Sequence, residues 1–292
     1  FTVAETLLLW AGKMPFFDAI CHSFTTMATG GFSTKQASIA HWPSPYIQYV
    51  IIVFMFLAGT NFTLSYFAIK GKFSVAFKDE EFKYYSFFTL GFTALIFIGL
   101  LISAEIGIEK AFRDSLFQVI TIITTTGYAT ADYLTWPPVL TMLIFVLFFF
   151  GGSAGSTGGG IKIMRIVVLL KNGYYELKRL VHPNAIIPVR FNKHSVDAKI
   201  VTNVLAFFMI YFVIFAISTV IFTLIEPDME SSMGAVATCL GNIGPGLGSV
   251  GPAENFYHIK PIGKWFLSFL MLLGRLELFT VLVLFSPSFW KE

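Results

Sequence analysis

Three short clusters rich in threonine and glycine contain the residues best suited to bind an ion. They read TTMATGGFS at 25–33, TTTGYAT at 124–130 and TCLGNIGPG at 238–246. Glycine permits the left-handed backbone that turns carbonyl oxygens toward one axis, where they can replace the water shell of a cation. Aligned on one glycine each, the clusters predict six ion-binding residues: Thr29 and Gly30, Thr126 and Gly127, and Ile243 and Gly244.

A stretch about as long as one short helix precedes each cluster, at 16–27, 110–124 and 228–240. We expect these helices to enter the membrane and point their C-terminal ends, each with about half a negative charge, at the midplane. Backbone that turns back within a membrane must be hidden in protein or line a watery path. A single glycine would be an ordinary turn residue, but three in register favour an ion path.

A further glycine-rich run, GGSAGSTGGG at 151–160, interrupts the apolar stretch 138–171. Each glycine disfavours a helix by about 1 kcal/mol relative to alanine, so we expect a break near mid-membrane, beneath the ion-binding loops. The functional interpretation is a mobile gate, and the alternative is a close helix crossing through small residues. The predicted gate residues are Gly151, Gly152, Ser153, Gly155, Ser156, Thr157, Gly158, Gly159, Gly160 and Arg275.

Arg275 stands out because it lies within the apolar run 265–285. A charged side chain at such a position costs at least about 2.5 kcal/mol and persists mainly for function. Glu277 is only two residues away, on another face of a helix, so Arg275 needs a different partner, for which the loop 151–160 is a candidate. We expect Arg275 to face the ion path, and the alternative is a buried polar network between repeats.

Other functional classes fit less well. Residues 151–155 match G-x-S-x-G, the motif of serine hydrolases, but the five histidines lie outside the full spans, away from this serine. Ile161 precedes Lys162, so no phosphate-binding P-loop is formed. The sequence therefore predicts neither an enzyme nor a cofactor. A substrate-binding secondary transporter is the main rival, yet it would carry inverted repeats, whereas these units share one polarity.

The composition indicates a membrane protein that crosses the bilayer several times. Of 292 residues, 55% are hydrophobic and 13% charged, and the mean hydropathy is +0.74. The net charge of +3 comes in short clusters, which excludes a surface for nucleic acid. The runs 46–69, 84–104 and 200–225 are apolar and uncharged, which predicts three uninterrupted spans. Residues 1–11 are interpreted as the end of a further helix.

Most cations fall in two of the links between spans, which the positive-inside rule places in the cytoplasm. The other links carry fewer cations and are expected outside. The cytoplasmic cations are Lys70, Lys72, Lys78, Lys83, Lys162, Arg165, Lys171, Lys178, Arg179, Arg190, Lys193 and Lys199.

The motifs together resemble the TrkH/KtrB/HKT superfamily of potassium transporters, in which four M1-pore-M2 units surround a pseudo-fourfold axis. HPNAIIPVR at 182–190 is more similar to the bacterial TrkH type than to KtrB. Three filter segments are present where four are expected, so the first unit is expected upstream of Phe1. The motifs that carry the resemblance are ATGGFST, TTTGYAT, GGSAGSTGGGIK, NIGPG and GRLEL.

The resemblance implies an all-α membrane protein that takes up potassium across the inner membrane, with K⁺ bound at Gly30, Gly127 and Gly244. It also implies that the loop 151–160 obstructs the pore and that Arg275 lies below the filter. A sodium-permeable member of the superfamily stays open as an alternative, because sodium-favouring members replace a glycine in the first unit.

Units and partners follow from the same resemblance. The expected partners are a second copy in a homodimer, the lipid bilayer, and a cytoplasmic nucleotide-binding subunit of the TrkA type that contacts the basic loop 171–199. The expected divisions are a second unit at 1–70, a cytoplasmic link at 71–83, a third unit at 84–171, a cytoplasmic link at 172–198 and a fourth unit at 199–287.

Overall fold

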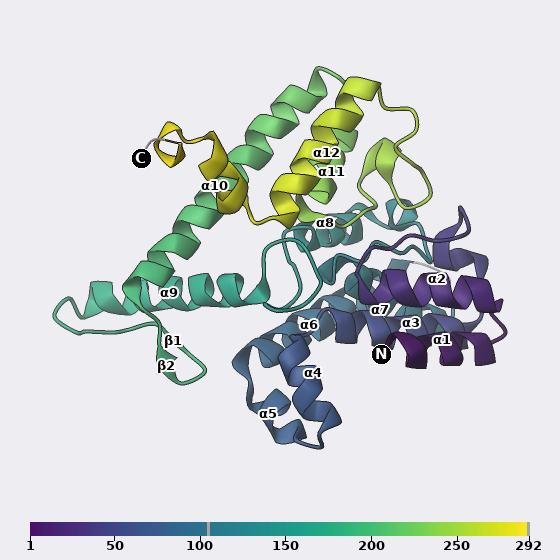
Figure 1. Ribbon diagram of the computed structural model, residues 1–292, viewed down its shortest axis with the longest axis horizontal. Coiled ribbons are helices and arrows are strands. Elements are labelled where there is room, and N and C mark those ends of the chain that lie inside the picture. Colours follow the sequence, from purple (N-terminus) through teal and green to yellow (C-terminus); the bar gives the residue numbers. More distant parts are fainter. Residues whose placement is uncertain (104–105, 291–292) are drawn as a thin grey trace.

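Helices make up nearly all of the regular structure in the computed structural model, which describes residues 1–103 and 106–290 (Figure 1). One antiparallel hairpin pairs β1 (Arg190–Phe191) with β2 (His194–Ser195). The helices are α1 (Thr2–Ala11), α2 (Phe16–Met27), α3 (Pro45–Ala58), α4 (Phe62–Ile69), α5 (Phe73–Lys78), α6 (Glu80–Ser103), α7 (Ile108–Ile123), α8 (Pro138–Leu147), α9 (Ile163–Val181), α10 (Ala198–Thr223), α11 (Met229–Gly241), α12 (Pro261–Arg275) and α13 (Leu278–Leu282).

One arrangement occurs three times along the chain: a helix, a short helix, a loop and a second helix. The short helices α2, α7 and α11 pack against the helices before them, α1, α6 and α10, and against those after them, α3, α8 and α12. Their bounds match the short helices expected at 16–27, 110–124 and 228–240 to within two residues. The direct repeat predicted from the sequence is therefore confirmed.

Within residues 1–103 and 106–290, two helices are long and apolar enough to span a membrane unbroken, namely α6 and α10. They confirm the spans expected at 84–104 and 200–225, although Ala104 lies outside the described residues. Large apolar side chains project from α10 into the surroundings, as lipid-facing side chains do. On α10 they include Met209, Val213, Ile217 and Val220.

The uninterrupted span expected at 46–69 is wrong. The chain bends by 111° between α3 and α4, with Gly59, Thr60 and Asn61 at the break. Asn61 caps α4 by accepting a hydrogen bond from the backbone N–H of Thr63 at 2.8 Å. The cause lies in a distant segment, because the Gly59 carbonyl accepts from the backbone N–H of Ser153.

The other two interrupted stretches are broken as well. Between α12 and α13 the chain bends by 115° beside Glu277, whose φ of 57° is a left-handed value. The stretch 138–171 breaks between α8 and α9, from 148 to 162, so the interruption is longer than the glycine run and α9 continues to 181. The number of possible spans among the described residues rises from two to four if each bent pair, α3 with α4 and α12 with α13, is counted as one span.

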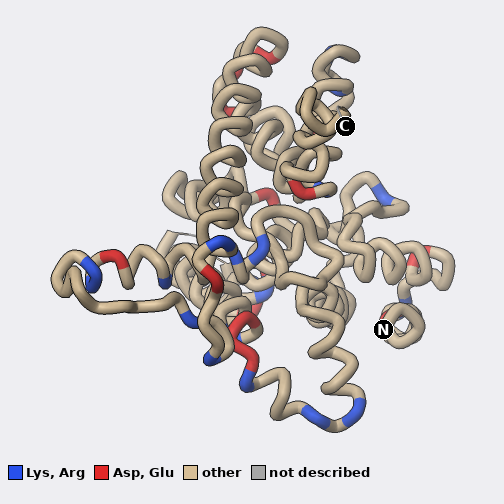
Figure 2. Tube along the Cα trace, turned by 60° about the vertical axis from the view of Figure 1, so that its left-hand side comes forward, with Lys and Arg blue, Asp and Glu red and all other residues tan. Residues whose placement is uncertain are grey.

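The two basic links predicted to be cytoplasmic lie on the same side of the molecule. Lys171 of α9 pairs with Glu80 at the start of α6, and its Nζ also donates to the carbonyl of Arg190 at 2.9 Å. In Figure 2 many of the Lys and Arg segments lie in the lower half of the view, and the turn between α4 and α5 is at the bottom.

Candidate ion path and intramembrane loop

The three short helices end in the same backbone conformation. Shortly after the end of each helix, a residue adopts a left-handed φ, of 49°, 56° or 56°. The residue that follows it donates its N–H to the carbonyl of a threonine five positions earlier, at 2.7, 2.9 or 2.9 Å. This turn reverses the chain at the negative end of each helix dipole. The left-handed residues are Thr29, Thr125 and Asn242, and the accepting threonines are Thr25, Thr121 and Thr238.

This geometry corrects the register of the first loop. The equivalent glycines have left-handed φ values of 64°, 85° and 117° at Gly31, Gly127 and Gly244. Gly30, which the sequence alignment paired with Gly127, lies one residue before Gly31, and its φ is not left-handed. The first cluster contains two adjacent glycines, so either Gly30 or Gly31 could be aligned with Gly127. In all three segments one glycine follows a threonine at the spacing Thr-x5-Gly, and this spacing would have selected Gly31.

Neighbouring loops approach one another through these glycines. A Cβ built on Gly31 would lie 1.9 Å from the carbonyl oxygen of Thr126, and one on Gly127 would lie 2.0 Å from that of Ile243. The same contact thus relates the first loop to the second and the second to the third. Repetition of one contact is what rotation about a common axis produces.

The side chains of Tyr128 and Tyr133 connect the loops by hydrogen bonds, and neither residue was predicted from the sequence. The hydroxyl of Tyr128 lies 2.6 Å from Thr25 Oγ1 and donates to the carbonyl of His22 at 3.0 Å, which joins the second loop to α2. Tyr133 donates its hydroxyl to the carbonyl of Gly246 at 2.7 Å, which joins it to the third loop.

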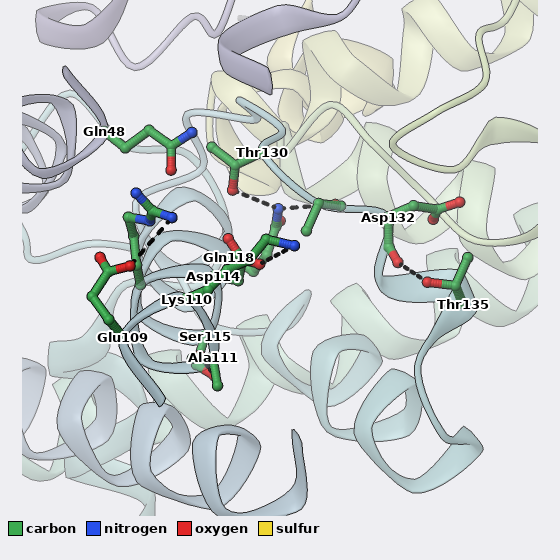
Figure 3. A network of polar contacts seen from close by, with 12 residues as sticks. Gln48, Glu109, Lys110, Ala111, Asp114, Ser115, Gln118, Thr130, Asp132 and Thr135 are labelled. Carbon is green, nitrogen blue, oxygen red and sulfur yellow. Dashed lines mark hydrogen bonds and ion pairs between the residues drawn. The ribbon is translucent and has the colours of Figure 1, made fainter. Parts of the chain in front are cut away.

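Polar side chains on α7 support the chain that leaves the second loop (Figure 3). Gln118 Nε2 donates to the carbonyl of Ala131 at 3.0 Å and to Thr130 Oγ1 at 3.5 Å. Lys110 and Asp114 pair one turn apart at 3.8 Å on the same helix. The Lys110–Asp114 pair stays within α7, so it is Gln118 that ties the chain after the second loop to this helix.

A cavity of about 400 Å³ opens between the first and third loops. Its described lining does not include Thr126 or Gly127, whose backbone packs against the neighbouring loops. Four of the six predicted ion-binding residues and one predicted gate residue are therefore brought together. They are Thr29, Gly30, Ile243, Gly244 and Arg275.

The segment 148–162, which we call the intramembrane loop, contacts the end of every short helix. Thr29 donates its hydroxyl to the carbonyl of Thr157 at 2.8 Å, and the Gly159 N–H donates to Thr125 Oγ1 at 2.6 Å. A Cβ on Gly159 would lie 2.8 Å from that of Asn242. The loop therefore lies directly against the three left-handed residues.

The predicted gate residues divide into two groups. Gly151, Gly152 and Ser153 are buried at the base of the loop, where the Gly151 N–H donates to the carbonyl of Ile161 at 2.8 Å. Residues 155–160 line a second cavity, of about 340 Å³, together with Lys162, Arg275 and Glu277.

Arg275 borders both cavities, but the partner expected for it in the glycine run is not found. Among the described residues its side chain makes no hydrogen bond or ion pair, and it is Lys162 whose Nζ donates to the carbonyl of Gly158. Glu277 pairs with Arg165 of α9 at 2.5 Å, so α9 is tied to the break between α12 and α13.

Long apolar helices, three short helices each followed by a glycine-containing loop, and a repeated contact between these loops are the architecture of an integral membrane protein. The family model described as "TrkH: Cation transport protein" matches residues 4–292, and the chain belongs to this family. The family is one of transporters and not of enzymes.

Relatives agree with this assignment. The Trk system potassium uptake protein TrkH of Escherichia coli K12 is 42% identical over 100% of this chain and 60% of its own length. TrkG of the same strain is 33% identical over 96% of this chain and 57% of its own length. The crystal structure of the potassium transporter TrkH from Vibrio parahaemolyticus matches with a TM-score of 0.94 and 39% identity, covering 99% of this chain and 62% of that one. The chain thus spans about 60% of the length of these relatives.

Proposed function

We propose that this chain forms ion-binding and gating parts of a potassium uptake protein in the cell inner membrane. The observation that carries the proposal is the repeated glycine-to-carbonyl approach, Gly31 on Thr126 and Gly127 on Ile243, which orders three loops around one axis. The names of the relatives favour K⁺ as the transported ion. The direct repeat argues against a substrate-binding secondary transporter with inverted halves.

Carbonyl oxygens of the three loops would bind the ion. The candidates are the six residues predicted from the sequence, to which the left-handed geometry adds Gly31. The C-terminal ends of α2, α7 and α11 add negative potential at the same level, which favours a cation over an anion.

The intramembrane loop would close the path and Arg275 would oppose cations below the filter. Both parts of the proposal are supported by position, because the loop contacts Thr29, Thr125 and Asn242 and because Arg275 borders both cavities. A fixed positive charge in a low-dielectric surround raises the barrier to a cation.

The assembly would follow the resemblance. We propose the unit boundaries 1–70, 84–171 and 199–287 with links between them, a homodimer, and a TrkA-type subunit bound to the cytoplasmic link. Exposed cations on that link, such as Lys193 and Arg190, support an acidic partner surface.

The test replaces Gly127 with Ser in the protein that contains this chain, expressed in cells without potassium uptake of their own. A Cβ there would meet the Ile243 carbonyl, so discrimination of K⁺ from Na⁺ should fall several-fold in uptake measurements. Gly91→Ala, on α6 with nothing within 4 Å of the added Cβ, is the matched control. Equal uptake of both ions by the unmodified protein would favour the sodium-permeable alternative.

A further inference from the structure

Glu81 is a buried carboxylate that holds the chain on both sides of residues 155–160 of the intramembrane loop. It lies in the first turn of α6 with 6% of its surface exposed. Its Oε1 accepts the backbone N–H of Ala154 at 2.6 Å and that of Met164 at 3.3 Å. Ala154 precedes the segment 155–160 and Met164 follows it, so one oxygen atom ties the two sides of the loop to a different helix.

The bond to Met164 has a specific physical basis. Met164 lies in the first turn of α9, where backbone N–H groups have no partner within the helix. A carboxylate placed there satisfies one of them and interacts favourably with the positive end of the helix dipole. Lys162, the residue at the N-cap of α9, supplies no such side-chain bond.

Other bonds at the base of the loop act differently. The Gly151 N–H donates to the carbonyl of Ile161 within the loop, and the Ile163 N–H, at the start of α9, donates to the carbonyl of Gly152 at 3.2 Å. Both bonds connect the loop only to itself or to the helix that directly follows it. Glu81 instead comes from α6, a complete spanning helix, so it ties the loop to a separate element, as the Gly59 carbonyl also does by accepting the N–H of Ser153.

The same turn of α6 also grips the cytoplasmic hairpin. Asp79 Oδ2 accepts from Asn192 Nδ2 at 2.8 Å, and Glu80 Oε2 accepts from the Asn192 N–H at 2.7 Å. The Glu80 N–H donates to Asn192 Oδ1 at 2.7 Å. Asn192 lies in the turn between β1 and β2. Three consecutive residues therefore connect this hairpin to the intramembrane loop.

We propose that Glu81 is a positioning residue that holds the intramembrane loop against the three ion-binding loops, and that the grip on Asn192 lets movement of the cytoplasmic hairpin loosen it. The proposal rests on the proposed role of the loop as a gate. Displacement of the hairpin would shift the first turn of α6 and lengthen the bonds to Ala154 and Met164.

The position of the loop can be read independently of ion flux. Ser156→Cys places a thiol on the loop beside the second cavity, and its rate of modification by a water-soluble maleimide is measured from the cytoplasmic side in vesicles of the full protein. The same protein with Ser156 intact corrects for Cys21 and Cys239. K⁺ flux is measured in the same vesicles.

Glu81→Leu removes the acceptor, and Glu81→Asp keeps the charge but is too short to reach both N–H groups. Both should raise modification and K⁺ flux at least threefold. Glu81→Gln keeps an acceptor oxygen at the same reach and should stay within twofold of the unmodified protein. Lys83→Ala, an exposed change on the same helix, is the control.

Asn192→Ala should raise modification about twofold, because it removes the side-chain bonds to Asp79 and Glu80. Lys83→Ala, which leaves these bonds intact, should not change the rate. An unchanged rate in Asn192→Ala would overturn the link from hairpin to loop.

The outcomes separate the two proposals. Unchanged modification in Glu81→Asp and Glu81→Leu would overturn the role of Glu81. Faster modification without greater flux would support the role of Glu81 and overturn the gate. If Glu81→Leu does not yield folded protein, Glu81→Asp decides, because it retains a carboxylate near α9.

Discussion

The carbonyl oxygen of Gly59 accepts a hydrogen bond from the backbone N–H of Ser153 at 2.9 Å, which joins the break between α3 and α4 to the break between α8 and α9. A second bond runs the other way, from the Phe62 N–H to the carbonyl of Gly155 at 3.2 Å. Backbone groups freed inside a membrane must find partners in protein. Each break therefore supplies partners that the other one needs.

Gly59→Ala should destabilise the protein and disturb the start of the second loop at Thr124. The added Cβ would lie 2.6 Å from Thr124 Cγ2 and from the Tyr85 hydroxyl, in a fully buried site. Overpacking of this kind costs about 1–3 kcal/mol. Thermal unfolding in detergent should show a lower midpoint than for Gly91→Ala, which meets no atom within 4 Å. Equal midpoints would contradict the close packing at Gly59.

Gly31→Ala and Gly30→Ala distinguish the structural register from the one expected from the sequence. Gly31 has a left-handed φ, and its Cβ would collide with the Thr126 carbonyl, so Gly31→Ala should abolish selective uptake. At Gly30 the nearest atom is 3.4 Å away, on Phe32, so Gly30→Ala should keep most of it. The measurement is K⁺ uptake at matched expression. The reverse order of effects would restore the register expected from the sequence.

Arg275→Ala should increase K⁺ flux, because a positive charge that borders both cavities raises the electrostatic barrier to a cation. Arg275→Lys keeps the charge and should keep flux near its original level. Flux is measured in vesicles with the protein amount matched. A loss of folded protein in Arg275→Ala, with Arg275→Lys also unfolded, would instead indicate a structural role.

Arg165→Ala should destabilise the protein more than Glu277→Ala. Arg165 pairs with Glu277 and also lies over the ring of Phe207 at 4.0 Å, so its loss removes two contacts. Because the Glu277 side chain is 53% exposed, the pair itself should be worth no more than about 1 kcal/mol. A double-mutant cycle on unfolding midpoints measures this coupling. A larger loss of stability in Glu277→Ala than in Arg165→Ala would show that the left-handed turn at Glu277 contributes more to stability than the contacts of Arg165.

The sequence alone determined the three short helices, the two unbroken spans and the repeat. The short helices at 16–27, 110–124 and 228–240 and the spans of α6 and α10 could be predicted because apolar runs and glycine clusters act locally, on neighbouring residues. The glycine run at 151–160 likewise predicted a broken helix, since each glycine weakens the helix around it.

Only the tertiary structure decided where chain breaks meet and which carbonyl group the glycine of the first loop approaches. The break at Gly59 depends on Ser153, and the special role of Gly31 depends on the carbonyl of Thr126. Glu277 finds its partner in Arg165, and Glu81 finds Ala154 and Met164. These partners lie far apart in sequence, so no local pattern encodes them. They meet because buried backbone and charged groups must be satisfied by whatever the fold brings beside them.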